Sequence, residues 1–166
     1  SEKELNKYFR KSLMRLNKKK LEGLYLHNNK DWDLEFVKQY INKLLNLEYI
    51  NNFGLTIYDK NSINLHPNIS ILQIPGNIFN QELMNNKNIY KFYNNGGSVF
   101  IRSIFIQGIL FKEASNIPKN LENLSKPITL FQKLAYTEGL QLEQLAIKVV
   151  QELCPFAKLI VGCDNT

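Results

Sequence analysis

The sequence predicts an α/β fold built on a parallel sheet. Five short runs are almost continuously apolar, which is typical of strands that helices cover on both faces. Between these runs, apolar residues recur at the spacing of helices with one buried face. The alternation of strand and helix indicates a parallel sheet. With 166 residues the chain can bury a substantial core, and we expect a single domain over residues 1–166.

The first half of the chain predicts two helix-and-strand pairs. A helical stripe precedes a short strand over Gly23–Leu26, and a second stripe precedes a strand over Phe53–Tyr58. The stripes consist of Leu5, Tyr8, Phe9, Leu13 and Leu16 in the first helix, and of Leu34, Val37, Ile41, Leu44 and Leu45 in the second.

Three further strands are predicted over Ile69–Ile74, Ser98–Arg102 and Leu159–Val161. The connection Asp59–Asn68 is too short for a full crossover helix, so we expect a single turn there. The polar stretch Phe111–Lys126 predicts a long loop after the fourth strand, and such loops often shape substrate pockets.

Helical patterns separate these later strands. Leu83, Ile89, Phe92 and Tyr93 form one broken stripe. Pro127 opens the next helix and Gly139 closes it, which are the positions that each residue favours. The last helix carries a stripe that ends at Pro155, and its members are Leu142, Leu145, Ala146, Val149, Val150 and Leu153.

Composition and charge exclude several classes of protein. The chain is 44% hydrophobic and 22% charged, which is ordinary for a globular protein, and it has neither a membrane-span-length apolar run nor a signal-like N-terminus. Its formal net charge is +6, but the only tight basic cluster, Lys18–Lys20, suits a solvated helix end better than a nucleic-acid site. Cys154 and Cys163 suggest reduced thiols of a cytoplasmic protein, and no metal-ligand spacing occurs. We therefore expect no nucleic acid, membrane or metal partner.

Glycine patterns do not indicate a phosphate-binding loop of a known type. No G-x-G-x-x-G or Walker pattern follows the first strand, and Gly96-Gly97 precedes a strand, so it predicts a turn. His27 is the more informative residue, because it stands directly after the apolar run Gly23–Leu26. Chemistry in parallel α/β folds is placed at the carboxyl ends of strands. A structural hydrogen-bonding role for His27 is the alternative.

Five segments, in order along the chain, resemble the aldo-keto reductase family. They are SLMRL (12–16) leading into LYLHN (24–28), FGLTIY (53–58), LQIP with NIFNQ (72–75 and 77–81), IRSIFIQGIL (101–110), and LAI with LIVG (145–147 and 159–162). They are similar to the family's segments from helix 3 to strand 8. The resemblance implies a (β/α)8 TIM barrel that is present here as an incomplete barrel of about five parallel strands, without strands 1–3 and the last helices.

The resemblance also implies roles for particular residues. Of the family's catalytic Asp, Tyr, Lys and His, only the His has a counterpart, His27, which would orient the substrate carbonyl. Trp32 would line the substrate pocket, although a surface aromatic covering a helix end is an equal alternative. The implied cofactor-binding residues are Thr56, Gln73, Arg102, Ser103 and Gly162.

The chemistry of these cofactor positions differs along the chain. Thr56 and Gln73 would contact the nicotinamide carboxamide, and the other three would lie near the cofactor phosphates. Ile57 stands where the family often has Asn, and its apolar side chain cannot make that hydrogen bond. Instead of contacting the cofactor, Arg102 would equally fit an ion pair at the end of the barrel. The sequence does not decide between NADPH and NADH, and we expect either cofactor to bind weakly or not at all to this chain alone.

The implied function is NAD(P)H-dependent reduction of an aldehyde or ketone. Family members with the RSxFxQG pattern tend to occur in surface-polysaccharide pathways, which makes a sugar derivative one candidate substrate. Because three catalytic counterparts are absent, we expect this chain to be a fragment or truncated form that is inactive alone. The alternative is a non-catalytic α/β half-barrel used for protein association.

Open strand edges suggest a partner for the chain. A closed barrel has no free edge, whereas an arc of five strands has two. We expect a missing N-terminal barrel segment, or failing that a second copy, to cover the opening. The inward-facing side chains expected to lose neighbours are Leu24, Leu26, Leu55, Ile57, Leu72 and Ile74.

Overall fold

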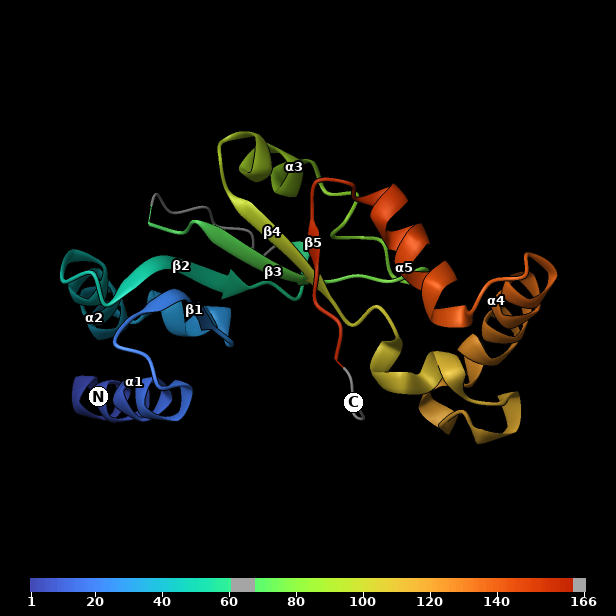
Figure 1. Cartoon of the computed structure of the whole chain (residues 1–166), viewed down its shortest axis with the longest axis horizontal. Coiled ribbons are helices and arrows are strands. Elements are labelled where there is room, and N and C mark those ends of the chain that lie inside the picture. The colour runs from blue at the N-terminus through green and yellow to red at the C-terminus, as the bar shows by residue number, and fades with distance from the viewer. Residues whose placement is uncertain (61–67, 163–166) are drawn as a thin grey trace. The chain divides into compact units, whose positions relative to one another are not determined.

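A computed structural model describes residues 1–60 and 68–162 (Figure 1). Its sheet contains five strands in chain order, β1 (Leu21–Leu26), β2 (Ile50–Thr56), β3 (Ile71–Pro75), β4 (Ser98–Arg102) and β5 (Lys158–Leu159). The α-helices are α1 (Glu2–Leu16), α2 (Glu35–Asn46), α3 (Lys87–Asn94), α4 (Ser125–Thr137) and α5 (Leu142–Leu153). The strands are parallel, and strand order follows chain order, so the predicted α/β class and parallel sheet are confirmed.

The chain divides into two compact units, each described here by itself. The first unit comprises Ser1–Ile74 with Lys87–Val99, and the second comprises Pro75–Asn86 with Phe100–Thr166. That residues 1–166 form one domain therefore stays a prediction.

The core of the first unit lies where α2 covers the sheet. In register, Leu24 of β1 pairs with Phe53 of β2, whose side chain is fully buried. From α2, the residues Val37, Ile41 and Leu44 are also buried. Full burial of one such side chain contributes about 1.5–3 kcal/mol, so this apolar face accounts for the position of α2.

Helix α1 follows its predicted stripe only in part. Ser1 and Glu4 form a capping box at its start, and Asn17 ends it in the left-handed region at φ 50°. Phe9 and Leu13 are buried, but Tyr8 and Leu16 are exposed, so the predicted buried face is too wide.

The second unit contains the best match between helix signals and structure. After α4, the amide of Gly139 donates to the carbonyl of Tyr136 and that of Leu140 to the carbonyl of Ala135. This pair of bonds is a Schellman motif, which needs the positive φ of 65° at Gly139. The predicted helix end is therefore confirmed. The start is two residues earlier than predicted, because Pro127 is accommodated within the first turn of α4.

The turn at Gly96-Gly97 closes α3 in the same way, as expected for a turn into the next strand. Gly96 has φ 88°, and the amide of Gly97 donates to the carbonyl of Phe92. A Cβ on Gly97 would lie 2.2 Å from the Phe92 ring, so only glycine fits this close approach.

Several predicted boundaries are wrong. Strand β2 spans Ile50–Thr56 and leaves Tyr58 beyond it, and β5 ends at Leu159, with Ile160 and Val161 partly exposed. In register, β5 pairs with Phe100 and Ile101 of β4, and the Ile160 amide donates to the Ile101 carbonyl at 2.8 Å just after the strand ends. The predicted loop Phe111–Lys126 contains two short 3-10 helices, Ala114–Asn116 and Lys119–Leu124.

Most of the predicted turn within Asp59–Asn68, and also Cys163, lie outside the described residues. Among the described residues, no helix has the length and apolar character that crossing a bilayer requires. The expected loss of inner neighbours is wrong for Leu55, Ile57, Leu72 and Ile74, which are at most 3% exposed. Only Leu24 and Leu26, on the edge strand β1, are partly exposed.

Candidate functional site

Three residues singled out from the sequence lie at neighbouring strand ends of the first unit. Leu26 pairs with Leu55, so His27 follows β1 beside the end of β2. Thr56 pairs in register with Gln73 of β3, and the amide of Ile57 donates to the carbonyl of Gln73 at 2.9 Å. His27, Thr56 and Gln73 are therefore successive polar residues at the carboxyl ends of three adjacent parallel strands.

His27 contacts Tyr58, a partner that the sequence analysis did not assign to the site. The Tyr58 hydroxyl lies 3.0 Å from His27 Nε2 and 3.3 Å from Nδ1, and the rings meet edge to face at 5.8 Å. The imidazole tautomer decides which atom donates. Both rings are exposed, so the pair presents an imidazole and a phenol to solvent. The structural hydrogen bond proposed as the alternative for His27 is present.

Thr56 and Gln73 differ in what they offer a ligand. Gln73 is half-buried, whereas Thr56 is 1% exposed. The Gln73 amide, with one donor group and one acceptor, is thus the more accessible hydrogen-bonding group of this pair.

Trp32 lies in the core of the first unit. It belongs to the 3-10 helix η1 (Asn29–Asp33), which begins where the Asn28 side chain accepts from the amide of Lys30. Its ring is 6% exposed and packs on Phe53 at 4.9 Å between centroids. The alternative of a surface aromatic is therefore wrong, and a substrate contact for Trp32 stays a prediction.

The second unit has a strained loop after β4. Ser103, Ile106 and Gln107 have φ values of 65°, 53° and 54°, and Gly108 has 81°. Such values are uncommon for residues other than glycine, and for β-branched Ile106 they are a genuine outlier. Strain of this kind collects at functional sites, because the surrounding structure must hold it in place. No sequence pattern predicted this left-handed backbone conformation.

This loop forms one wall of a groove of about 480 Å³. Ile160, Val161 and Gly162, which follow β5, form the other wall. The groove brings together Ser103 and Gly162, two residues predicted separately from the sequence. Arg102 precedes the loop, is half-buried, and donates from Nη1 to the Ser103 hydroxyl at 3.1 Å.

Hydrogen bonds of the Asn77 side chain link the loop after β3 to the loop after β4. Its Oδ1 accepts from the amides of Phe79 and Asn80, both at 2.9 Å, and its Nδ2 donates to the Ser103 carbonyl at 3.4 Å. Asn77 is 7% exposed, one of two buried polar residues among those described. The sequence could have indicated this role, because Asn77 stands two residues after a buried strand, a position where asparagine favours a turn.

The two strand-end clusters have different chemistries. In the first unit, imidazole, phenol and amide groups can hydrogen-bond a carbonyl or carboxamide. In the second, the Ser103 hydroxyl accepts from the Arg102 guanidinium beside an open groove that Ser103 lines, and this pairing of a cation with a hydroxyl suits an anion such as a phosphate. Within residues 1–60 and 68–162, no group of three or more His, Cys, Asp or Glu side chains is arranged to hold a metal ion.

Neither a protein-family model nor a curated protein matches the sequence. Solved structures do match. An aldo-keto reductase from Bacillus halodurans in its apo form aligns with 99% of this chain and 59% of its own length, at 17% identity and a TM-score of 0.73. An aldo-keto reductase from Klebsiella pneumoniae in complex with NADPH aligns with 97% of this chain and 55% of its own, at 15% identity and a TM-score of 0.71.

A second Klebsiella pneumoniae structure, in complex with NADP and acetate, aligns with 96% of this chain and 54% of its own, at 16% identity and a TM-score of 0.69. At these identities the likeness shows the fold alone. The chain has an aldo-keto-reductase-type fold and spans little more than half the length of these structures, as an incomplete (β/α)8 barrel.

Proposed function

We propose that this chain is part of an NAD(P)H-dependent oxidoreductase that reduces an aldehyde or ketone, with a sugar derivative as one candidate substrate. The observation that carries the proposal is the groove after β4, where strained Ser103 faces Gly162. The sequence resemblance assigns both residues to the cofactor phosphates. Neighbours of the same fold that were crystallised with NADP and NADPH add support.

The residues present fit a nicotinamide cofactor in two places. Ser103 supplies a hydroxyl and Arg102, which is bonded to it, supplies a nearby cation for the phosphates, and Gly108 and Gly162 leave open space where a Cβ would stand. Gln73 supplies an amide for the carboxamide, with Thr56 beside it. When bound, the cofactor supplies a hydride to the carbonyl carbon.

In this proposal His27 hydrogen-bonds the substrate carbonyl and orients it at the strand ends. The chain has no counterpart of the family's Asp, Tyr and Lys. A positioned proton donor contributes roughly 10²–10⁴-fold to such a reaction. We therefore propose that the 166-residue chain does not reduce carbonyls by itself, although it keeps part of the cofactor site.

A fluorescence titration of the purified chain with NADPH tests the cofactor site. Gln73→Leu removes the amide and should raise the Kd about three- to tenfold, the usual effect of losing one hydrogen bond. Gln151→Leu is the control, because Gln151 is exposed on α5. Because binding by this chain alone is expected to be weak or absent, the titration extends to millimolar NADPH. Binding that is equally tight in the parent chain and in Gln73→Leu contradicts the proposed site.

An activity assay tests the role of the chain separately. We expect no oxidation of NADPH with glyceraldehyde as the carbonyl. Oxidation that is lost in His27→Ala would show that this chain is catalytic alone and would overturn the inactivity proposal, while supporting the oxidoreductase function.

The proposed partner of the chain covers the outer edge of β1. Strands β1 and β5 are the edges of the sheet, and β1 pairs only with β2. We propose that barrel strands of the kind present in the longer neighbours cover β1, with a second copy of the chain as the fallback. Light scattering should detect association. A homogeneous monomer of 19.4 kDa that unfolds cooperatively would contradict this.

The proposed compartment is the cytoplasm, where thiols stay reduced. Cys154 fits this environment, since it is a free and fully buried thiol.

A further inference from the structure

The positive charge of this protein is concentrated at one end of the chain. Residues 1–20 contain eight of the 21 lysines and arginines but only two of the 15 acidic residues. The remaining 146 residues therefore carry thirteen of each sign, and the whole formal net charge of +6 belongs to α1 and the three lysines after it. Among the described residues, no ion pair involves any of these eight cations.

The same region contains two hollows that share Arg10 and Tyr49. One has a volume of about 480 Å³ and lies between α1 and the end of α2, and the other, of about 640 Å³, lies against the end of α1. Together we name them the α1 groove. Its apolar and aromatic lining consists of Phe9, Leu13, Met14, Tyr40, Leu44, Leu47 and Tyr49.

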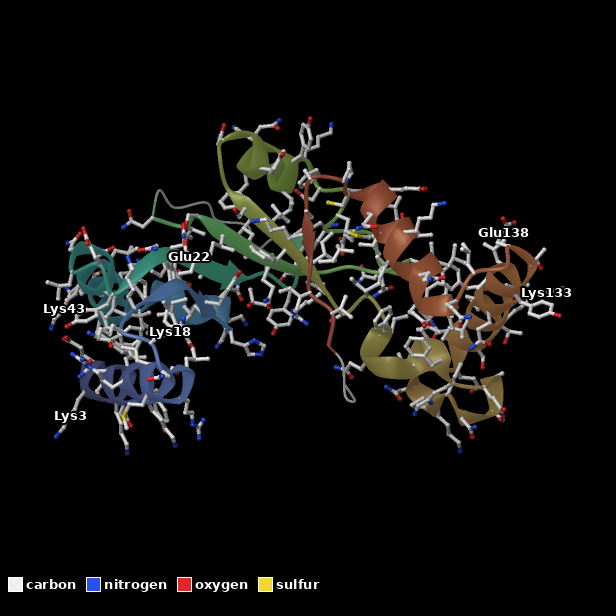
Figure 2. All side chains as sticks on the ribbon, in the orientation of Figure 1. Lys3, Lys18, Glu22, Lys43, Lys133 and Glu138 are labelled. Carbon is white, nitrogen blue, oxygen red and sulfur yellow. The ribbon has the colours of Figure 1, made fainter. Side chains whose placement is uncertain are left out.

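The cationic side chains of the α1 groove are Lys3, Arg10, Lys18, Lys19 and Lys43. Figure 2 shows Lys3, Lys18 and Lys43 in this part of the molecule. One carboxylate, that of Glu2, also lines the groove, and Lys43 Nζ binds it at 2.9 Å. The lining thus presents an apolar floor and a nearly unopposed positive rim.

The floor of the groove is held in place. The Arg10 guanidinium lies 5.2 Å from the centre of the Tyr49 ring, and Phe9 meets the same ring edge to face at 6.3 Å. The Tyr49 carbonyl accepts from the amide of Leu21 at 2.9 Å. A preformed surface of this kind loses little conformational entropy on binding.

We propose that the α1 groove binds an acidic segment of a partner protein, with apolar side chains seated on the floor and carboxylates facing the rim. An apolar centre with a charged rim is the usual anatomy of a protein interface, and grooves of this form take amphipathic helices. A nucleic acid would leave the apolar floor unused. It would also find one face of Tyr49 covered by Arg10, which leaves a poor stacking platform.

The α1 groove lies away from the proposed catalytic end of the first unit. Tyr49 directly precedes β2, and Lys18 and Lys19 precede β1, so the groove is at the amino ends of these strands. His27 and Thr56 are at their carboxyl ends. The proposal is therefore independent of the proposed oxidoreductase function.

Fluorescence anisotropy on the 166-residue chain tests the proposal. The probe is a labelled 16-residue peptide of glutamate with leucine at helical spacing. Two comparison probes are the same peptide with serine in place of leucine, and a labelled 16-nucleotide oligothymidylate. We expect the leucine peptide to bind most tightly, and its affinity to fall between 0.1 and 1 M salt, as the screening length drops from about 10 to 3 Å.

Two variants and two matched controls locate the site. The double variant Lys18→Glu and Lys19→Glu should raise the Kd at least tenfold, and the exposed pair Lys126→Glu and Lys133→Glu on α4 should leave it within twofold. Leu47→Asn should also raise the Kd about tenfold. Its control is Leu130→Asn, because Leu47 and Leu130 are 57% and 59% exposed.

Circular dichroism confirms that each variant is folded, which is expected because all these positions are exposed. Saturable binding of the leucine peptide, lost in the groove variants alone, supports the proposal. Absence of saturable binding, equal binding of the serine peptide, an equal effect of the α4 variants, or tighter binding of the oligonucleotide each overturns it.

Discussion

Replacing Trp32 measures whether this residue belongs to the core or to a ligand pocket. In the structure its ring is 6% exposed and packs on fully buried Phe53 at 4.9 Å. Trp32→Ala therefore removes a large buried side chain, and such changes destabilise by about 3–5 kcal/mol. The aromatic pair supplies roughly 0.5–1.5 kcal/mol of this. Because domains are stable by only about 5–15 kcal/mol, the variant should lose a large part of its stability.

Urea unfolding followed by far-UV circular dichroism is the appropriate assay, since Trp32 is the only tryptophan and fluorescence would be lost with it. Trp32→Phe keeps one ring and should destabilise by about 1–2 kcal/mol. Tyr136→Ala is the control, because Tyr136 is 87% exposed and surface changes stay within about 0.5 kcal/mol. A loss below about 1 kcal/mol for Trp32→Ala would refute the core assignment and restore the pocket interpretation.

Three further outcomes are expected. Burial raises the pKa of the Cys154 thiol from 9.0 to about 11, so the stability that the neutral thiol gives is complete below pH 9 and is lost as the pH rises toward 11. The free energy of unfolding, measured with urea, should thus fall over this pH window by roughly 2–3 kcal/mol more in the parent chain than in Cys154→Ala. Parallel pH profiles of the two proteins would contradict this. Gly97→Ala should destabilise by about 1–3 kcal/mol, because its Cβ would enter the Phe92 ring, and thermal unfolding measures this. Asn77→Ala should speed hydrogen exchange at the Phe79 and Asn80 amides, which lose their acceptor, and unchanged exchange would show that the side chain does not hold this turn.

The strands were predictable because burial on both faces leaves a continuous apolar run that a single segment reveals. Strand β4 matches its prediction residue for residue, since the Gly96-Gly97 turn precedes it and the strained Ser103 ends it. Edge strand β5 does not match. Ile160 and Val161 are as apolar as buried strand residues, and their exposure depends on a neighbouring strand that no local pattern reports.

The candidate site was predictable only in its location. The end of a buried run identifies His27, because strand ends follow from local pattern, whereas Gln73 is assigned by the family resemblance. The contact between His27 and Tyr58 joins residues 31 positions apart, and no spacing rule encodes it. The left-handed backbone at Ile106 and Gln107 was also unforeseeable, since glycine and asparagine are the usual signals for that conformation.

The open edges of the sheet leave few of its apolar side chains exposed. Leu55, Ile57, Leu72 and Ile74 are buried within the described chain, so exposed inner side chains do not by themselves prevent a compact monomer. The apolar side chains that remain partly exposed are Leu24 and Leu26 of β1. If each lacks about half of the 1.5–3 kcal/mol available from full burial, covering the edge adds roughly 1.5–3 kcal/mol.

That increment is a modest share of a typical domain stability of about 5–15 kcal/mol. Association through β1 should therefore be favourable but reversible, and dilution should dissociate it. Leu24→Lys would place a charge on the edge that a partner strand must bury, so it should abolish association, and circular dichroism checks that the monomer stays folded. Light scattering over a hundredfold range of concentration measures both effects. Association that survives this variant unchanged would place the contact elsewhere on the molecule.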